Sequence, residues 1–223
     1  MRTIAIIGGT GPQGKGLGYR FAKAGYDVIL GSRSEERAME AAVELQARVT
    51  SAGSVSGASN ATAAQAADLV LLAVPYVGHD DLVTELAPEL AGKIVVSCIN
   101  PLGFDKQGPY GLDLGGTSAA ETAQMLLPEA RVVGAFHHLS AVTLIGEADT
   151  LDHEDVLVCG DNADAKAAVI DLAATITGKP GIDAGALRLA RQLEPLTAVL
   201  ISVNKRYKVR SGIAVVGLSP DVH

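Results

Sequence analysis

Short runs of Val, Ile and Leu alternate along the chain with longer, Ala-rich segments. The runs predict strands at 2–7, 27–31, 54–57, 68–74, 93–97, 131–136 and 155–159. The segments between them carry apolar residues at helical spacing and predict helices at 12–24, 34–50, 61–66, 78–90, 118–127 and 163–177. Continuously apolar strands such as DLVLLAVP require cover on both faces. The pattern therefore predicts an α/β protein with a doubly wound parallel sheet.

Two stretches break this alternation. Residues 101–116 are rich in Gly and Pro, and we expect a long loop there that borders a substrate pocket. Past Gly185 the pattern predicts one long helix, kinked at Pro195, with an apolar stripe. The stripe consists of Leu189, Leu193, Leu196, Leu200 and Val203. Packing on the chain's own sheet is favoured over a subunit interface on this pattern alone. We expect a nucleotide-binding part at 1–150 and a smaller part at 151–223, packed on the same core.

Composition and charge exclude several classes of function. The 223 residues are 48% hydrophobic and only 4% aromatic, which suits a core of small aliphatic side chains. A net charge of −7 argues against binding to nucleic acid or to an anionic membrane surface. No apolar stretch is long enough to span a membrane and no targeting segment is evident, so we expect a cytoplasmic protein. Cys98 and Cys159 lie in apolar runs and are interpreted as reduced core residues.

A glycine-rich turn follows the first strand directly. Gly9, Gly11 and Gly14 satisfy the GxGxxG pattern, and Gly18 lies one helical turn further on. The glycines allow a tight turn, close approach of a pyrophosphate and close packing of helix on strand. The free N–H groups and the positive dipole end of the helix then face the phosphates. Because the pattern lies between a strand and a helix, it predicts a dinucleotide site.

The end of the second strand indicates which dinucleotide. An NAD site would have Asp or Glu here to bind the ribose 2′-hydroxyl, but the chain reads LGSRSEER. Ser32 can donate to a 2′-phosphate, and Arg33 and Arg37 present guanidinium groups suited to phosphate oxygens. Both arginines lie at a helix start, where the dipole disfavours cations. We therefore expect NADP.

Three further strand ends are expected at the same edge of the sheet. Val74–Tyr76 follow the fourth strand, Asn100 and Pro101 the fifth, and His137 and His138 the sixth. Open α/β sheets bind ligands at this edge. The two histidines lack the additional ligands of a metal site, so no metal is expected. For each of them, a buried and hydrogen-bonded core histidine is an equally weighted interpretation.

The motifs GGTGPQGKG, GSRSEE, AVPY, VVSCINP, AFHH and VCGDNADAK together resemble the F420:NADP oxidoreductases. The resemblance runs nearly end to end. It implies a Rossmann domain with a small C-terminal helical part, a homodimer and two nucleotide substrates, NADP and the deazaflavin coenzyme F420 (8-hydroxy-5-deazaflavin). The implied reaction passes a hydride between C4 of the nicotinamide and C5 of the deazaflavin.

The resemblance also assigns roles to single residues. At the pyrophosphate these are Thr10, Gly11, Pro12 and Gln13, and at the 2′-phosphate Ser32, Arg33 and Arg37. Beside the ribose and nicotinamide they are Val74, Tyr76 and Asn100 to Leu102, and beside the deazaflavin His137, Leu139 and Ala141. The chain departs from the family pattern at Tyr76, where Trp is expected, and at Ser140, where Pro is expected.

Hydride transfer needs two rings held face to face, and positioning supplies much of the rate. We expect the histidines mainly to position the ring, and His137 or His138 to deliver a proton as the second possibility. Two other functions remain open on the residues alone. One is an NADP-dependent reductase of another acceptor, such as ferric ion, an imine or a flavin, and the other is a non-catalytic NADP sensor.

Overall fold

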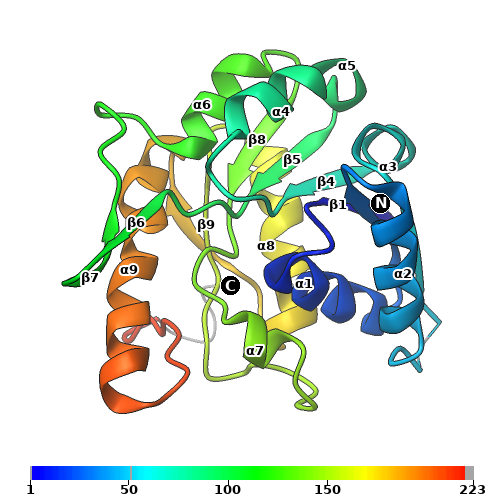
Figure 1. Ribbon diagram of the computed structural model, residues 1–223. Helices are drawn as coiled ribbons and strands as arrows, with labels where there is room; N and C mark the ends of the chain where they lie inside the picture. Colours follow the sequence, from blue (N-terminus) through cyan, green and yellow to red (C-terminus); the bar gives the residue numbers. More distant parts are fainter. Residues whose placement is uncertain (1, 51, 219–223) are drawn as a thin grey trace.

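In residues 2–50 and 52–218, which the computed structural model describes, eight strands form one sheet (Figure 1). The strands are β1 (Thr3–Ile7), β2 (Asp27–Ser32), β3 (Ser54–Ser59), β4 (Leu69–Leu72), β5 (Ile94–Ser97), β8 (Arg131–Gly134), β9 (Leu157–Gly160) and β10 (Ile182–Gly185). Their order is β10-β9-β8-β5-β4-β1-β2-β3, and the six strands from β8 to β3 are mutually parallel. The predicted α/β fold with a doubly wound parallel sheet is confirmed by these six strands.

Helices cover both faces of the sheet (Figure 1). They are α1 (Pro12–Lys23), α2 (Glu35–Gln46), α3 (Asn60–Ala66), α4 (His79–Glu85), α5 (Ala87–Leu90), α6 (Ala119–Leu126), α7 (Ala141–Leu144), α8 (Ala163–Thr177), the short 3-10 helix η1 (Leu187–Leu189) and α9 (Ala190–Tyr207). Alternate residues of one strand enter opposite cores: Ile4 and Ile6 pack with Leu17 of α1, whereas Ala5 and Ile7 pack on the α3 and α6 side. This arrangement explains why the central strands are apolar throughout.

The sheet differs from the prediction at one edge. β9 runs antiparallel to β8, pairing Val133 with Gly160 and Gly134 with Cys159, and β10 is a further strand that the sequence analysis did not predict. An apolar run shows that a segment is a buried strand but carries no signal for its direction. The strand predicted at 155–159 is therefore present as β9 but runs opposite to its neighbour β8, so the sheet is mostly parallel.

The expected loop at 101–116 is largely a hairpin. β6 (Leu102–Asp105) and β7 (Gly108–Gly111) pair antiparallel, and the Asp105 carboxylate accepts hydrogen bonds from the backbone of Gln107 and Gly108 in the turn. Gly108 has φ +124°, which the tight turn requires. The strands were missed because they lack a buried apolar run: Phe104 and Tyr110 are both exposed.

The helical predictions also need two corrections. The helix expected at 78–90 divides into α4 and α5 at Leu86, and α7 was not predicted. α9 runs through Pro195 without interruption. Its apolar stripe is only partly covered, since Leu193 is buried and Leu189 is 38% exposed. No helix in the described part of the chain has both the length and the apolar character needed to cross a membrane.

Candidate functional site: a nucleotide crevice at the strand ends

Four neighbouring parallel strands, β8, β5, β4 and β1, end at one edge of the sheet. Hydrogen bonds tie the segments that follow them. Asn100 Nδ2 donates to the carbonyl of His137 at 2.9 Å, and Cys98 Sγ donates to the carbonyl of Leu72 at 3.1 Å. The convergence predicted for Asn100 and His137 is thus present in the structure.

The glycine turn lies against the neighbouring strand ends. Gly8 and Gly9 both donate backbone hydrogen bonds to Gly31 O, at 3.2 and 3.0 Å, which brings the turn beside Ser32. Gly8 has φ +83°, and a Cβ there would lie 2.6 Å from Ala73 O. The left-handed residue of the turn is therefore Gly8, one position before the predicted triad.

The first turn of α1 has the properties of an anion site. Gly11 is its N-cap and offers no side-chain hydrogen bond, Pro12 is its first residue, and the first turn contains no acidic residue. A Cβ on Gly14 would lie 2.6 Å from Gly8 O, so glycine is required for the close contact of helix and turn. The unpaired N–H groups and the dipole of this 12-residue helix suit a diphosphate. Thr10 lies between these glycines, half-buried.

The residues predicted to bind a 2′-phosphate lie at the end of β2 and the start of α2. Ser32 is half-buried, and its Oγ accepts a hydrogen bond from Ser34 N at 3.2 Å. The side chains of Arg33 and Arg37 are exposed, and neither has an ion-pair or hydrogen-bond partner among the described residues. Two unpaired guanidinium groups and a hydroxyl beside the glycine turn fit the phosphate dianion of NADP.

His137 is a buried, neutral imidazole among the segments that follow these strand ends. The residue is only 3% exposed, and neither ring nitrogen has a hydrogen-bond partner in the described structure. Burial, with a smaller contribution from the adjacent ring of His138, lowers the pKa of His137 to about 3. At neutral pH the ring is therefore uncharged and cannot act as a general acid, so its burial favours a positioning role.

α9 fixes the backbone around the two histidines. The ring nitrogen Nε2 of His138 lies 2.7 Å from Leu193 O, and Thr197 Oγ1 donates to His137 O at 3.0 Å. Burial lowers the pKa of His138 as well, although its hydrogen bond to Leu193 opposes the shift. His138 is therefore a buried, hydrogen-bonded core histidine that faces α9.

A buried carboxyl group on α9 holds the start of α6. Glu194 is 1% exposed and accepts hydrogen bonds from the backbone N–H groups of Ala119 and Ala120 at 2.9 and 3.0 Å. Burial raises the pKa of Glu194 to about 7, although the two backbone hydrogen bonds act in the opposite direction. Glu194 was not predicted as a functional residue. The signal for its structural role in the sequence is an acidic residue next to the apolar Leu193 of the stripe.

The Gln13 side chain faces the histidine segment, and the contact of this residue with the pyrophosphate stays a prediction. Its side-chain Nε2 donates to Phe136 O at 3.4 Å and to Leu139 O at 3.3 Å, so its amide faces the histidine segment. Leu139 is buried, and Phe136 adopts φ +61°, an uncommon conformation for a bulky residue. The backbone of this segment is thus held from the α1 side.

The remaining predicted residues lie after the ends of β4 and β5 and at the start of α7. Val74 contacts the glycine turn, since a Cβ on Gly8 would lie 2.8 Å from Val74 Cγ1. The Tyr76 ring stacks on that of His79 at 6.0 Å, and burial raises the Tyr76 pKa. Leu102 begins the hairpin and Ala141 begins α7, both half-buried. No cluster of three metal-ligating side chains occurs in residues 2–50 and 52–218.

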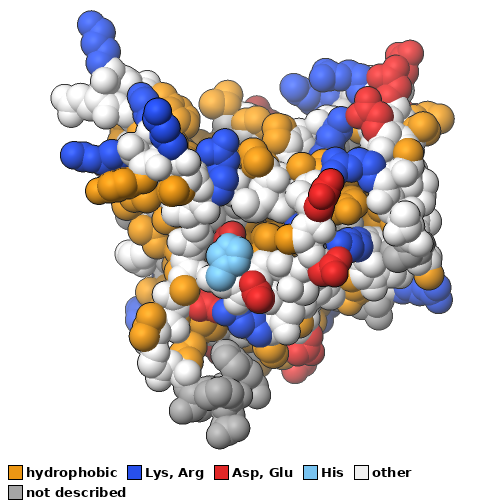
Figure 2. Space-filling view, turned by 90° about the horizontal axis from the view of Figure 1, so that it is seen from below, with side chains coloured by type: hydrophobic (Ala, Val, Ile, Leu, Met, Phe, Trp, Pro, Cys, Tyr) orange, Lys and Arg blue, Asp and Glu red, His pale blue; other side chains and the backbone are white. Residues whose placement is uncertain are grey.

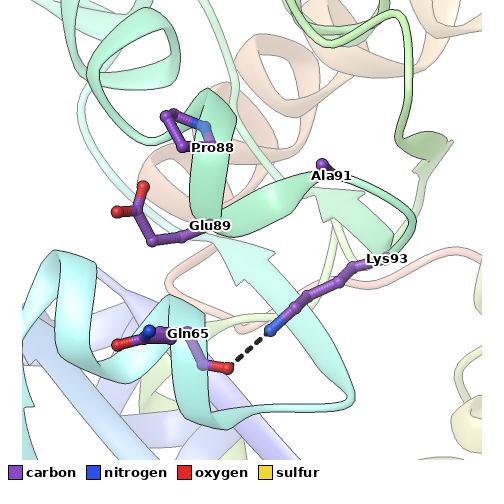
Figure 3. Close-up of a pocket in the computed structure, with 5 residues that line it drawn as sticks. All are labelled: Gln65, Pro88, Glu89, Ala91 and Lys93. Atoms are coloured by element: carbon purple, nitrogen blue, oxygen red, sulfur yellow. Dashed lines mark hydrogen bonds between the residues drawn. The ribbon is translucent and has the colours of Figure 1, made fainter.

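A hollow of about 340 Å³ lies at the opposite, amino-terminal edge of the sheet (Figure 3). Lys93, just before β5, reaches across it, and its ammonium donates to the carbonyl oxygens of Ala64, Gln65 and Ala67 at 2.7–2.8 Å. All three ammonium protons are therefore used to cap the end of α3. The hollow lies at the edge of the sheet away from the glycine turn.

Comparison with known proteins agrees with this geometry. The family described as "NADP oxidoreductase coenzyme F420-dependent" matches residues 3–101. F420-dependent NADP reductases of Methanocaldococcus jannaschii and Methanothermobacter thermautotrophicus are 40% and 38% identical to this chain. The alignments cover 96% of this chain and 98% and 95% of the relatives. A crystal structure of a putative F420-dependent NADP-reductase from Arthrobacter superposes with a TM-score of 0.80 at 28% identity, over 95% of this chain and 99% of the other.

The fold and the site together define a Rossmann-type, NADP-dependent oxidoreductase. The relatives narrow this class. The chain belongs to the F420-dependent NADP reductase family.

Proposed function

We propose that the protein transfers a hydride between NADP(H) and coenzyme F420. The observation that carries the proposal is a pair of exposed arginines, Arg33 and Arg37, that lie beside the glycine turn, next to strand ends where His137 is buried and uncharged. Hydride transfer moves two electrons and one hydrogen from C4 of the nicotinamide to C5 of the deazaflavin, and the ring takes a proton from solvent. The reaction needs orientation and exclusion of water more than a charged catalyst.

His137 positions the acceptor in this proposal, and His138, hydrogen-bonded to α9, holds the neighbouring backbone. Both rings are buried and have pKa values lowered by burial, so neither is poised as a general acid near neutral pH. Both ring nitrogens of His137 are buried without a hydrogen-bond partner, so in this proposal the ring acts by supporting the segment against which the deazaflavin lies. Asn100 and Thr197, which both donate to His137 O, keep the ring in place.

The direct test adds NADPH and F420 to the purified protein and follows the loss of the deazaflavin absorbance. NADPH deuterated at C4 on the transferred face should give F420 labelled at C5. Label recovered in water, or turnover with ferric ion, an imine or an ordinary flavin and none with F420, would assign a different acceptor. NADPH binding without turnover of any acceptor would instead indicate an NADP sensor.

A homodimer in the cytoplasm is part of the same proposal. Its support is the apolar surface that α9 and the following residues leave uncovered: Val199 is 55% exposed and Tyr207 68%. Figure 2 shows hydrophobic side chains there among Lys and Arg side chains, on the left of the face seen from below. Light scattering at micromolar concentration should give twice the chain mass of 22.8 kDa. A mass equal to one chain would refute the dimer.

A further inference from the structure

One face of α1 is fastened along its whole length to the segment 136–149. Gln13, Gly16 and Arg20 follow each other at spacings of three and four and therefore lie on the same side of the helix. Gln13 donates to the carbonyls of Phe136 and Leu139. The first turn of α1 is the expected site of the nucleotide phosphates, and the same helix thus also binds the segment predicted to contact the deazaflavin.

The middle of this contact permits no side chain on the helix. A Cβ on Gly16 would lie 2.7 Å from the Cβ of Leu144 and 3.4 Å from Ala141 O. α7 therefore rests directly on the backbone of α1. At such a close approach a shift of α1 is transmitted to α7 and to the residues before it.

Arg20 anchors the far end. It is 1% exposed, and its guanidinium donates to Leu144 O and Ala148 O at 2.6 Å, to Thr143 O at 2.9 Å and to Asp149 O at 3.0 Å. No carboxylate oxygen of the described residues lies within salt-bridge distance of it, and burial lowers its pKa. Burial of a charge on carbonyl groups alone is costly. Because these hydrogen bonds are directional, Arg20 fixes the geometry of residues 143–149, which an apolar side chain would not do.

Phe136, the first residue of the segment 136–149, is held in a strained backbone conformation. Phe136, at φ +61°, packs edge to face on Phe21 of α1, with ring centroids 5.9 Å apart. Strained backbone persists where its surroundings determine it, and here two residues of α1, Gln13 and Phe21, do so. The strained residue immediately precedes His137.

We infer that Gln13 and Arg20 are positioning residues for the deazaflavin, joining the acceptor segment 136–149 to the nucleotide-binding helix. Gln13 acts at the site end and Arg20 at the remote end. The inference concerns the Gln13 side chain and is separate from the pyrophosphate contact predicted for this residue, which its backbone N–H can make. It rests on the proposed function, because it takes the acceptor to be F420 bound beside His137 and Leu139.

The test is steady-state kinetics with F420 and NADPH together with NADPH binding measured by fluorescence. Gln13→Met keeps length and flexibility but removes the donor. We expect KM for F420 to rise about five- to tenfold, the effect of one neutral hydrogen bond, while the dissociation constant for NADPH stays within about twofold. Lys15→Met is the matched control, since Lys15 lies on the same helix but pairs with Glu44 of α2. It should change neither value.

Arg20 gives an independent arm. Arg20→Lys retains charge and three donors, and should raise KM for F420 less than Arg20→Met does. Equal losses of NADPH and F420 affinity in Gln13→Met would make Gln13 a phosphate ligand and overturn the inference, as would no change in either. The urea midpoint of each variant is compared with that of the wild type, and an equal midpoint shows that a raised KM is not caused by unfolding. If Arg20→Met does not fold, the Gln13→Met measurement still tests the inference. A wild type inactive with F420 would overturn the proposed function itself; an active wild type with unaffected variants overturns only the inference.

Discussion

Replacing His137 by Leu should make the protein more resistant to acid. In the native state burial holds the His137 pKa at about 3, against an ordinary value of 6.5. A lowered pKa means that the unfolded chain binds a proton that the native chain excludes. The stability is therefore fully present above pH 6.5 and is lost as the pH falls from 6.5 towards 3.

The size of the effect follows from the same two values. Each pH unit below 6.5 costs about 1.4 kcal/mol, so the loss by pH 4.5 is about 3 kcal/mol. Glu194, whose pKa is raised to about 7, has the opposite sign: its stabilisation is lost as the pH rises through 7. Both proteins contain Glu194, so the difference between wild type and His137→Leu isolates the histidine.

The assay is urea unfolding followed by circular dichroism at several pH values between 4.5 and 8. The gap between the two free energies of unfolding should shift by about 3 kcal/mol in favour of His137→Leu at the acid end. His153→Leu serves as the control, because the His153 side chain is 72% exposed. Parallel curves for wild type and His137→Leu would show that the imidazole is solvated and would remove the argument for a neutral ring.

The other predictions concern the 2′-phosphate site, the carbonyl groups that Lys93 caps, and the contact between α1 and α7. Arg33→Ala should lower kcat/KM for NADPH by about 10- to 100-fold and leave that for NADH nearly unchanged, since a charge-assisted hydrogen bond is worth about 1.5–3 kcal/mol; a wild type that uses both nucleotides equally would contradict the assignment. Lys93→Met should destabilise the fold by about 1–3 kcal/mol, measured by urea unfolding, with kcat unchanged, because it leaves three carbonyls of α3 uncapped. Gly16→Val should raise KM for F420, because its side chain would push against Leu144; an unchanged KM would show that α7 moves freely.

The central strands and the glycine turn were predictable because burial and phosphate binding leave local signals. The run DLVLLAVP identifies β4. Between β1 and α1, the glycine spacing identifies the turn, because a Cβ on Gly8, Gly9 or Gly14 would collide with neighbouring atoms. The direction of β9 and the β6–β7 hairpin were not predictable, since pairing depends on contacts between distant segments. The orientation of Gln13 was missed for the same reason: its partners lie 123 and 126 residues away.

The bonds from α9 have a consequence for the order in which the protein is made. Leu193 contacts His138 across 55 residues, Thr197 contacts His137 across 60, and Glu194 reaches Ala119 across 75. During synthesis the N-terminal part emerges first, and its parallel strands and glycine turn need none of these contacts. The contacts that fix the backbone around His137 and the start of α6 can therefore form only after α9 has been released from the ribosome.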